Sequence, residues 1–134
     1  MQNLEDPNYW KSLINIGLSK FFVIKILYEE PTHGYGILKK LTDLTEGCCV
    51  PTFGSIYPIL AKLTKEGYTK ILKASNSEQG RKKKIYALTP KGKKTYKIAL
   101  EAWRKTLPFI RKAIDSEYTD EAPNTIFPVY RLKG

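Results

Sequence analysis

The stretch PTFGSIYPILAKLTKEG, residues 51–67, decides the fold of this chain. Thr52 has a side-chain oxygen that can cap the start of a helix, and Gly67 is a typical stop after its end. Between them the apolar residues recur at helical spacing: Ile56, Ile59, Leu60 and Leu63. The opposite face holds Gly54, Pro58, Ala61 and Lys65, flanked by Ser55, Tyr57 and Lys62. This pattern predicts a helix ending at residue 66 whose small outer face can approach another surface closely.

Two further helices are predicted before this stretch. Residues 10–28 are apolar at almost every helical angle, which indicates a helix buried on more than one side, and Pro31 ends it. Thr32 is expected to cap a second, short helix. Its inner face carries Ile37, Leu38, Leu41 and Leu44. Residues 46–51 have no helical period and are predicted to form the turn between the second and third helices.

After Gly67 the apolar pattern changes to the period of two that is typical of strands. Residues 68–74 and 84–89 are the predicted strands, and the polar connection 75–83 contains Gly80, so we expect a hairpin with a long tip. Three helices followed by a hairpin is the element order of a winged helix-turn-helix. The expected fold is therefore mainly α with a small β-hairpin, extended by one long C-terminal helix.

That last helix is expected to begin at Thr89 and Pro90, a capping residue followed by a proline suited to the first turn. Its apolar residues follow the spacing 4, 3, 4, 3, 4: Tyr96, Leu100, Trp103, Leu107, Ile110 and Ile114. Such a heptad seam is typical of a helix that packs on a partner helix, so it predicts dimerisation. Pro108 is expected to kink the helix near Thr106 or to split it in two.

The expected organisation has three parts. Residues 10–90 form the winged helix-turn-helix with its N-terminal helix, residues 90–115 form the dimerisation helix, and residues 116–134 form a tail. The tail is first acidic and then apolar, and its pattern leaves open whether it is flexible or docks on the body.

The charge of the chain is concentrated in one segment. The net charge is +10, and residues 62–94 hold eleven lysines or arginines against two glutamates. A basic cluster favours a polyanionic partner, either nucleic acid or an acidic membrane surface. Because this cluster covers the outer face of the third helix and the hairpin tip, double-stranded DNA is the partner that we expect. No apolar run reaches the roughly 18 residues of a membrane span, and the first residues lack the order of a secretory signal, so we expect a cytoplasmic protein.

Several classes of function are disfavoured by missing residues. The chain has no nucleophile paired with a base and no glycine-rich phosphate loop, so an enzyme is not expected. With His33 as its one histidine, it also lacks a ligand set for a metal, and we expect no cofactor. The adjacent Cys48 and Cys49 would form a strained disulfide, so we expect reduced, inert turn residues rather than a redox sensor.

Three motifs in this order resemble the PadR family of transcriptional regulators. They are PTHGYGI at 31–37, PTFGSIYPIL at 51–60 with Leu63 and EGY at 66–68, and GRKKKIYALTPKG at 80–92. The resemblance covers roughly residues 15–115 and implies a winged-helix homodimer, often a repressor, whose last helix supplies dimer contacts. The segment ALEAW, residues 99–103, is similar to the multidrug-responsive members, which implies an effector pocket lined by Leu100, Trp103 and Leu107. Pro108 and the tail depart from the family pattern.

The third helix is expected to enter the major groove of a pseudo-palindromic site, and the hairpin is expected to touch phosphates or the minor groove. The predicted DNA-binding residues are His33, Tyr35, Lys39, Thr52, Ser55, Tyr57, Lys62, Arg81, Lys82, Lys83 and Lys84. The expected partners are duplex DNA, a second copy of the chain and a planar aromatic or lipophilic small molecule.

Other interpretations of the same residues remain open from the sequence. The lysines of the tip can serve as a solvated loop, Ser55 and Tyr57 as surface residues, and Trp103 as a core residue of the seam. At the level of the whole chain, the alternatives are a winged helix that binds RNA and one that binds another protein.

Overall fold

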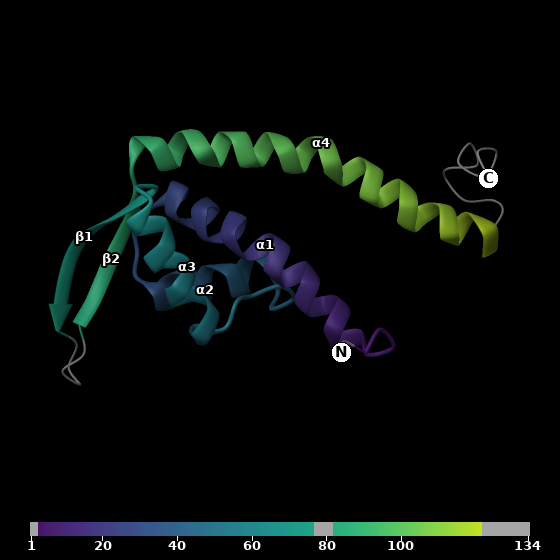
Figure 1. The fold of residues 1–134 in the computed structure, drawn as a ribbon, viewed down its shortest axis with the longest axis horizontal. Coiled ribbons are helices and arrows are strands. Elements are labelled where there is room, and N and C mark those ends of the chain that lie inside the picture. Colours follow the sequence, from purple (N-terminus) through teal and green to yellow (C-terminus); the bar gives the residue numbers. More distant parts are fainter. Residues whose placement is uncertain (1–2, 77–81, 122–134) are drawn as a thin grey trace. The chain divides into compact units, whose positions relative to one another are not determined.

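The computed structural model describes residues 3–76 and 82–121. In them three helices are followed by one hairpin and a fourth helix, which is the predicted order (Figure 1). The elements are α1 (Pro7–Glu29), α2 (Gly34–Thr45), α3 (Phe53–Lys65), β1 (Thr69–Asn76), β2 (Lys82–Leu88) and α4 (Pro90–Glu121). The predicted fold class, mainly helical with a two-stranded antiparallel hairpin, is confirmed. The chain divides into two units, residues 1–97 and 98–134, and each is described by itself.

The core of the first unit is made by the C-terminal half of α1 together with α2, α3 and the hairpin. Its completely buried side chains come from the three helices: Val23, Ile37, Leu41, Ile56 and Leu60. The prediction that α1 is buried on more than one side holds only for its second half. Its first half exposes Trp10, Leu13, Ile14 and Ile16 in the single chain. The end of α2 also departs from the predicted inner face, because Leu44 is 53% exposed.

The cap of α2 differs from the prediction. His33, not Thr32, is the N-cap residue, and its ring Nδ1 accepts a hydrogen bond of 3.0 Å from the Gly36 N–H. Thr32 instead forms a bridge with Tyr86 of β2, in which each backbone N–H donates to the other's carbonyl. The extended backbone that this bridge requires places Thr32 one residue before the His33 cap. The connection from α1 to α2 is thereby fastened to the hairpin.

The turn between α2 and α3 begins with two left-handed residues, Glu46 and Gly47. After them, Cys48 and Cys49 are joined in a disulfide between neighbouring residues, so the expectation of reduced cysteines is not met in this structure. Pro51 is buried, and α3 starts directly after the Thr52 cap.

The hairpin pairs Thr69 with Leu88 at its base and Asn76 with Lys82 at its far end, with a bulge between Ile71 and Lys73. Both strands are longer than predicted, so residues 75, 76, 82 and 83 belong to the ladder rather than to the tip. The remaining tip, residues 77–81, lies outside the described residues.

Helix α4 starts as predicted, since the Thr89 hydroxyl accepts the Gly92 N–H at 3.1 Å and Pro90 is the first helical residue. It does not split at Pro108. It runs without interruption to Glu121, six residues past the predicted end, and bends in its second half (Figure 1). A proline removes one backbone hydrogen bond, and a long helix absorbs that loss by bending.

Candidate nucleic-acid interface

The two faces of α3 differ as the sequence predicts. Ile56, Leu60 and Leu63 are at most 3% exposed, and Ile59 is partly buried. On the other side, every residue of the predicted outer face is exposed: Gly54, Ser55, Tyr57, Pro58, Ala61, Lys62 and Lys65. In the single chain nothing that the structure describes covers this small, polar surface. We call it the outer face of α3.

The start of α3 is held by a local network. The Thr52 hydroxyl accepts the Ser55 N–H at 3.1 Å and lies 2.9 Å from the Ser55 hydroxyl. Both side chains are exposed, so each keeps hydrogen-bonding capacity for a partner. The prediction that Thr52 caps the helix is confirmed by this geometry. The DNA-binding roles predicted for Thr52 and Ser55 stay predictions.

Tyr57 crosses from α3 to the start of α2 and fits against a glycine. A Cβ built on Gly34 would lie 2.8–2.9 Å from the ring and hydroxyl of Tyr57. Gly34 is buried, whereas Tyr57 remains 46% exposed. The absence of a side chain at residue 34 therefore lets the Tyr57 ring lie flat between the two helices while one side faces solvent.

The N-terminus of α2 brings three of the predicted residues beside α3. His33 is partly buried through its capping role, Tyr35 is 55% exposed, and Lys39 is exposed. The ring of Tyr35 stacks on that of Phe53, the first residue of α3, with centroids 6.0 Å apart. Phe53 is not among the predicted DNA-binding residues, although it follows the Thr52 cap directly in the sequence.

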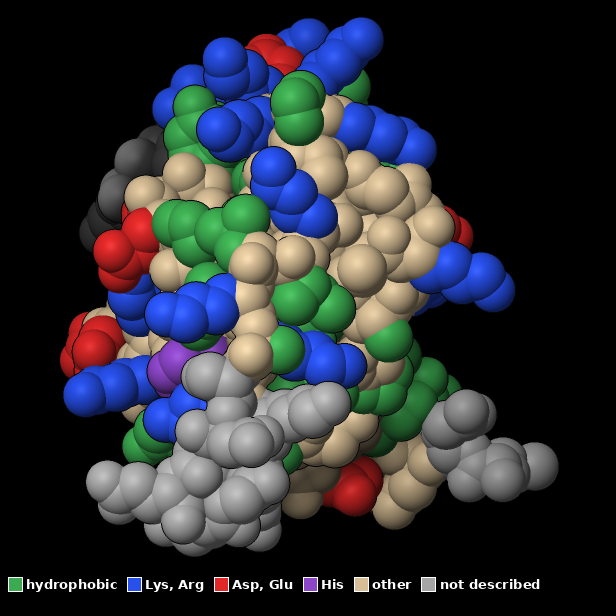
Figure 2. Space-filling view, turned by 90° about the vertical axis from the view of Figure 1, so that its left-hand side faces the viewer, with side chains coloured by type: hydrophobic (Ala, Val, Ile, Leu, Met, Phe, Trp, Pro, Cys, Tyr) green, Lys and Arg blue, Asp and Glu red, His purple; other side chains and the backbone are tan. Residues whose placement is uncertain are grey.

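The hairpin supplies exposed lysines next to one another. Lys83 and Lys84 are exposed on β2 and lie opposite Ser75 and Ala74, and the neighbouring pair of the ladder adds the exposed Lys73. Of the other predicted hairpin residues, Arg81 lies outside the described residues, and the side chain of Lys82 is not described. Figure 2 looks at the molecule from the hairpin side and shows lysine and arginine side chains across this face, with acidic ones mainly toward its edges.

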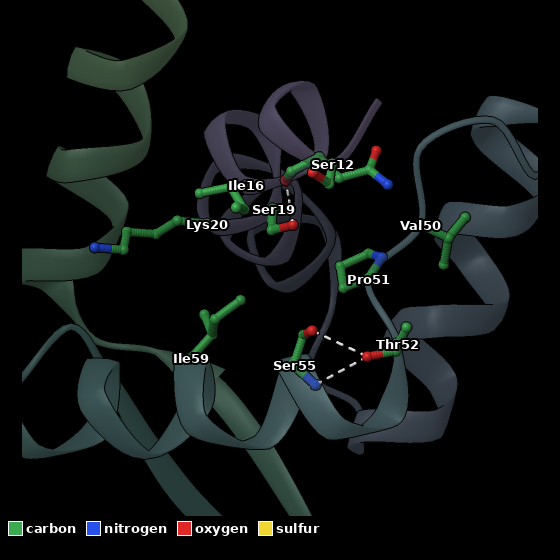
Figure 3. Close-up of a pocket in the computed structure, with 10 residues that line it drawn as sticks. Ser12, Ile16, Ser19, Lys20, Val50, Pro51, Thr52, Ser55 and Ile59 are labelled. Carbon is green, nitrogen blue, oxygen red and sulfur yellow. Dashed lines mark hydrogen bonds between the residues drawn. The ribbon is translucent and has the colours of Figure 1, made fainter. Parts of the chain in front are cut away.

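A groove of about 600 Å³, which the sequence analysis did not predict, lies between α1 and the start of α3 (Figure 3). It is lined by Ser12, Asn15, Ile16, Ser19, Lys20, Val50, Pro51, Thr52, Ser55 and Ile59. Lys20 is the one charged residue in this lining. Within the described residues, no group of three or more His, Cys, Asp or Glu side chains could hold a metal ion.

The predicted seam of α4 divides into buried and exposed parts. Tyr96 is only 7% exposed, because its ring stacks on Tyr28 at 4.3 Å and on Phe21 at 6.1 Å. Tyr96 therefore packs in the core of its own chain, and its predicted dimer contact stays a prediction. Leu100 and Trp103 are partly buried. Farther along, the exposed apolar residues are Leu107, Phe109, Ile110 and Ile114, and Phe109 was not predicted.

The helices of the described residues, 3–76 and 82–121, are too short or too polar to span a membrane.

The model of the PadR-like transcriptional regulator family matches residues 23–98, which include α2, α3, the hairpin and the start of α4. A curated relative, the transcriptional regulator YqjI of Escherichia coli (strain K12), is 36% identical over 76 residues, which are 57% of this chain and 34% of the relative. The chain thus spans about a third of the length of the curated relatives that it matches.

Solved structures agree with this match. A transcriptional regulator from Clostridium thermocellum is 30% identical with a TM-score of 0.63, covering 75% of this chain and 94% of its own. PadR of Bacillus subtilis, solved in complex with operator DNA, is 26% identical with a TM-score of 0.56, covering 62% of this chain and 47% of its own. Since the family model covers more than half of the chain, the protein belongs to the PadR-like family of transcriptional regulators.

Proposed function

We propose that this regulator binds duplex operator DNA as a homodimer, with the outer face of α3 in the major groove and the β1–β2 hairpin on the adjacent backbone. The observation that carries the proposal is the contrast between the two sides of α3. One side buries Ile56, Leu60 and Leu63, and the other exposes mostly small and polar residues along its whole length. A helix with small outward residues can enter the major groove deeply, so that Ser55, Tyr57 and Lys62 reach base edges or phosphates.

The hairpin lysines suit a phosphate partner. Lys73, Lys83 and Lys84 are exposed, and no salt bridge within the described residues involves them. Their charge is therefore available to displace the counterions condensed on DNA. The Bacillus subtilis neighbour was solved with operator DNA, which supports the same class of partner here.

The test is the salt dependence of binding to a duplex selected from a random pool. Because the homodimer carries two hairpins, Lys83→Ala/Lys84→Ala removes four lysines per complex. It should weaken binding to all sequences and reduce the slope of log K against log salt by roughly 4, since each phosphate contact contributes about 0.9. Lys11→Ala/Lys105→Ala, which removes two exposed lysines far away in the sequence, is the matched control and should keep the slope. An unchanged slope in the hairpin variant would contradict the proposed contact.

The homodimer is supported by exposed apolar residues on two helices. Leu107, Ile110 and Ile114 of the seam are 41–58% exposed in the single chain, and α1 exposes Trp10 and Ile16 by 51% and 73%. Burying such surfaces against a second copy removes apolar area from water. Two copies related by a twofold axis match a pseudo-palindromic site with half-sites about one helical turn apart.

The proposal also includes that the protein is a repressor and that a small-molecule effector controls its binding to DNA. An aromatic or lipophilic ligand beside Leu100, Trp103 and Leu107 would change the spacing of the two recognition helices and so lower DNA affinity. Titration with planar cationic dyes should alter the Trp103 emission and weaken DNA binding. Unchanged emission together with unchanged affinity would remove the ligand from the proposal.

The second candidate is an RNA-binding winged helix, which the net charge of +10 also suits. Competition between duplex DNA and structured RNA separates the two. A helix that enters the major groove needs its B-form width, which A-form RNA lacks.

A further inference from the structure

Four aromatic rings form a continuous row across the starts of α2 and α3. His33 stacks on Tyr35 with ring centroids 6.3 Å apart, Tyr35 on Phe53 at 6.0 Å, and Phe53 on Tyr57 at 6.4 Å. The ring planes of successive members differ by 1°, 6° and 13°. We call these four residues the aromatic row. Because successive rings are nearly parallel, the four side chains together form one continuous aromatic surface.

The row faces solvent although it is rich in apolar area. Tyr35, Phe53 and Tyr57 are 55%, 55% and 46% exposed. Their exposed halves contribute little to the core, because an apolar group stabilises a fold by leaving water. The row is nevertheless fixed in place, since the Tyr57 ring lies directly on Gly34 and His33 is held by its capping bond to Gly36.

Phe53 differs from the other three residues of the aromatic row because its side chain has no polar atom. The tyrosine hydroxyls and the histidine ring can bond to phosphates, whereas a phenyl ring can make only apolar and stacking contacts. Phe53 is also the first residue of α3, and the N-terminal residues of a recognition helix are those that contact base edges. Its neighbours on both sides, Tyr35 and Tyr57, hold the ring in one direction.

In the major groove the apolar group that distinguishes one base from the others is the C5 methyl of thymine. We propose that Phe53 contacts a thymine methyl in each half-site and thereby sets a sequence preference there. This proposal rests on the DNA binding argued above. It deepens that function, because it assigns recognition of the thymine methyl to the side chain of Phe53. The neighbouring tyrosines position the ring, and their hydroxyls contact the backbone without reading sequence.

The test replaces each thymine of a selected duplex by deoxyuridine, one position at a time, which removes only the methyl group. The full-length wild type should lose affinity by about fourfold at one position per half-site, the factor expected for burying one methyl-sized apolar group. Phe53→Ala should bind thymine and uracil equally at that position, and Phe53→Leu should keep part of the difference. Leu44→Ala, which trims another exposed apolar residue outside the row, is the matched control and should keep the wild-type profile.

Three results would overturn the proposal. One is a wild type that binds the duplex but tolerates uracil at every position, and another is Phe53→Ala with an unchanged thymine preference. Either leaves DNA binding itself intact. Failure of the wild type to bind any duplex would remove the proposed function together with this inference. Because Phe53 is largely exposed, the unfolding midpoint of Phe53→Ala should stay close to that of the wild type, so a loss of preference is not a loss of fold.

Discussion

At the residue scale, Gly34 of α2 and Tyr57 of α3 are in close contact. Gly34→Ala would place a methyl group 2.8–2.9 Å from the Tyr57 ring. Because the Tyr57 ring is half-exposed and can shift outward, we expect a loss of up to about 1 kcal/mol in the free energy of unfolding, at the low end for overpacked sites, measured by urea denaturation. In Gly34→Ala the Tyr57 ring should also move from its place on the outer face of α3, so DNA affinity should fall as well.

Gly17→Ala is the matched control for this substitution. Gly17 lies within α1, and a Cβ there would meet nothing within 4 Å. The same change should therefore stabilise the chain by about 0.5–1 kcal/mol, because alanine is more favourable than glycine in the interior of a helix. Equal effects of the two substitutions would show that the Gly34–Tyr57 contact has no special importance.

The free energy of unfolding should depend on pH in the alkaline range because of Tyr86. Burial raises the pKa of its hydroxyl above the ordinary value of 10.0, and the nearby Tyr57 raises it further. The folded chain thus holds this proton more tightly than the unfolded chain does. The resulting stability is present below the unfolded pKa and is lost as pH rises through the folded pKa.

Tyr86→Phe removes this titrating group. In the wild type the free energy of unfolding should fall more steeply above about pH 10 than in Tyr86→Phe, as measured by denaturant titration at several pH values. Parallel curves for the two proteins would mean that Tyr86 does not contribute to the alkaline loss.

At the element scale, the Thr52 cap fixes where α3 begins. Thr52→Ala removes the acceptor of the Ser55 N–H and should cost about 1 kcal/mol of stability. Thr52→Asn keeps a capping oxygen and should remain near the wild type in thermal unfolding. If Thr52→Asn loses as much as Thr52→Ala, the cap is not the source of the effect.

The sequence predicts most elements correctly because their signals are local. Thr52, Gly67 and the apolar spacing of α3 lie within one stretch, and Thr89 with Pro90 marks the start of α4. The cap of α2 could not be predicted in this way. Thr32 is the better capping residue by type, yet its backbone is used by Tyr86, which is distant in the sequence.

Contacts between distant segments also explain the other differences. Tyr96 fits the heptad seam by spacing, but its burial against Tyr28 depends on how α1 approaches the start of α4. The aromatic row likewise joins residues of two helices, and no pattern in the single sequence predicts that their rings are parallel.

At the scale of the whole molecule, the exposed seam of α4 predicts association. Ile110→Glu should raise the dimer dissociation constant by about tenfold or more, because an unpaired carboxylate is costly to bury. Sedimentation velocity over a concentration series measures this. Arg104→Glu places the same group on an exposed position of the helix outside the seam and should leave the dimer intact. A fully monomeric wild type would remove the dimer from the account.

The central claim is that the outer face of α3 and the β1–β2 hairpin contact one duplex together. The most direct measurement is the change in amide chemical shifts of the full-length chain on titration with a selected duplex. The account predicts coincident changes at Ser55, Tyr57 and Lys62 and at Lys83 and Lys84, saturating at the same DNA concentration. Changes confined to one of these two elements, or centred on residues 104–116 of α4, would contradict it.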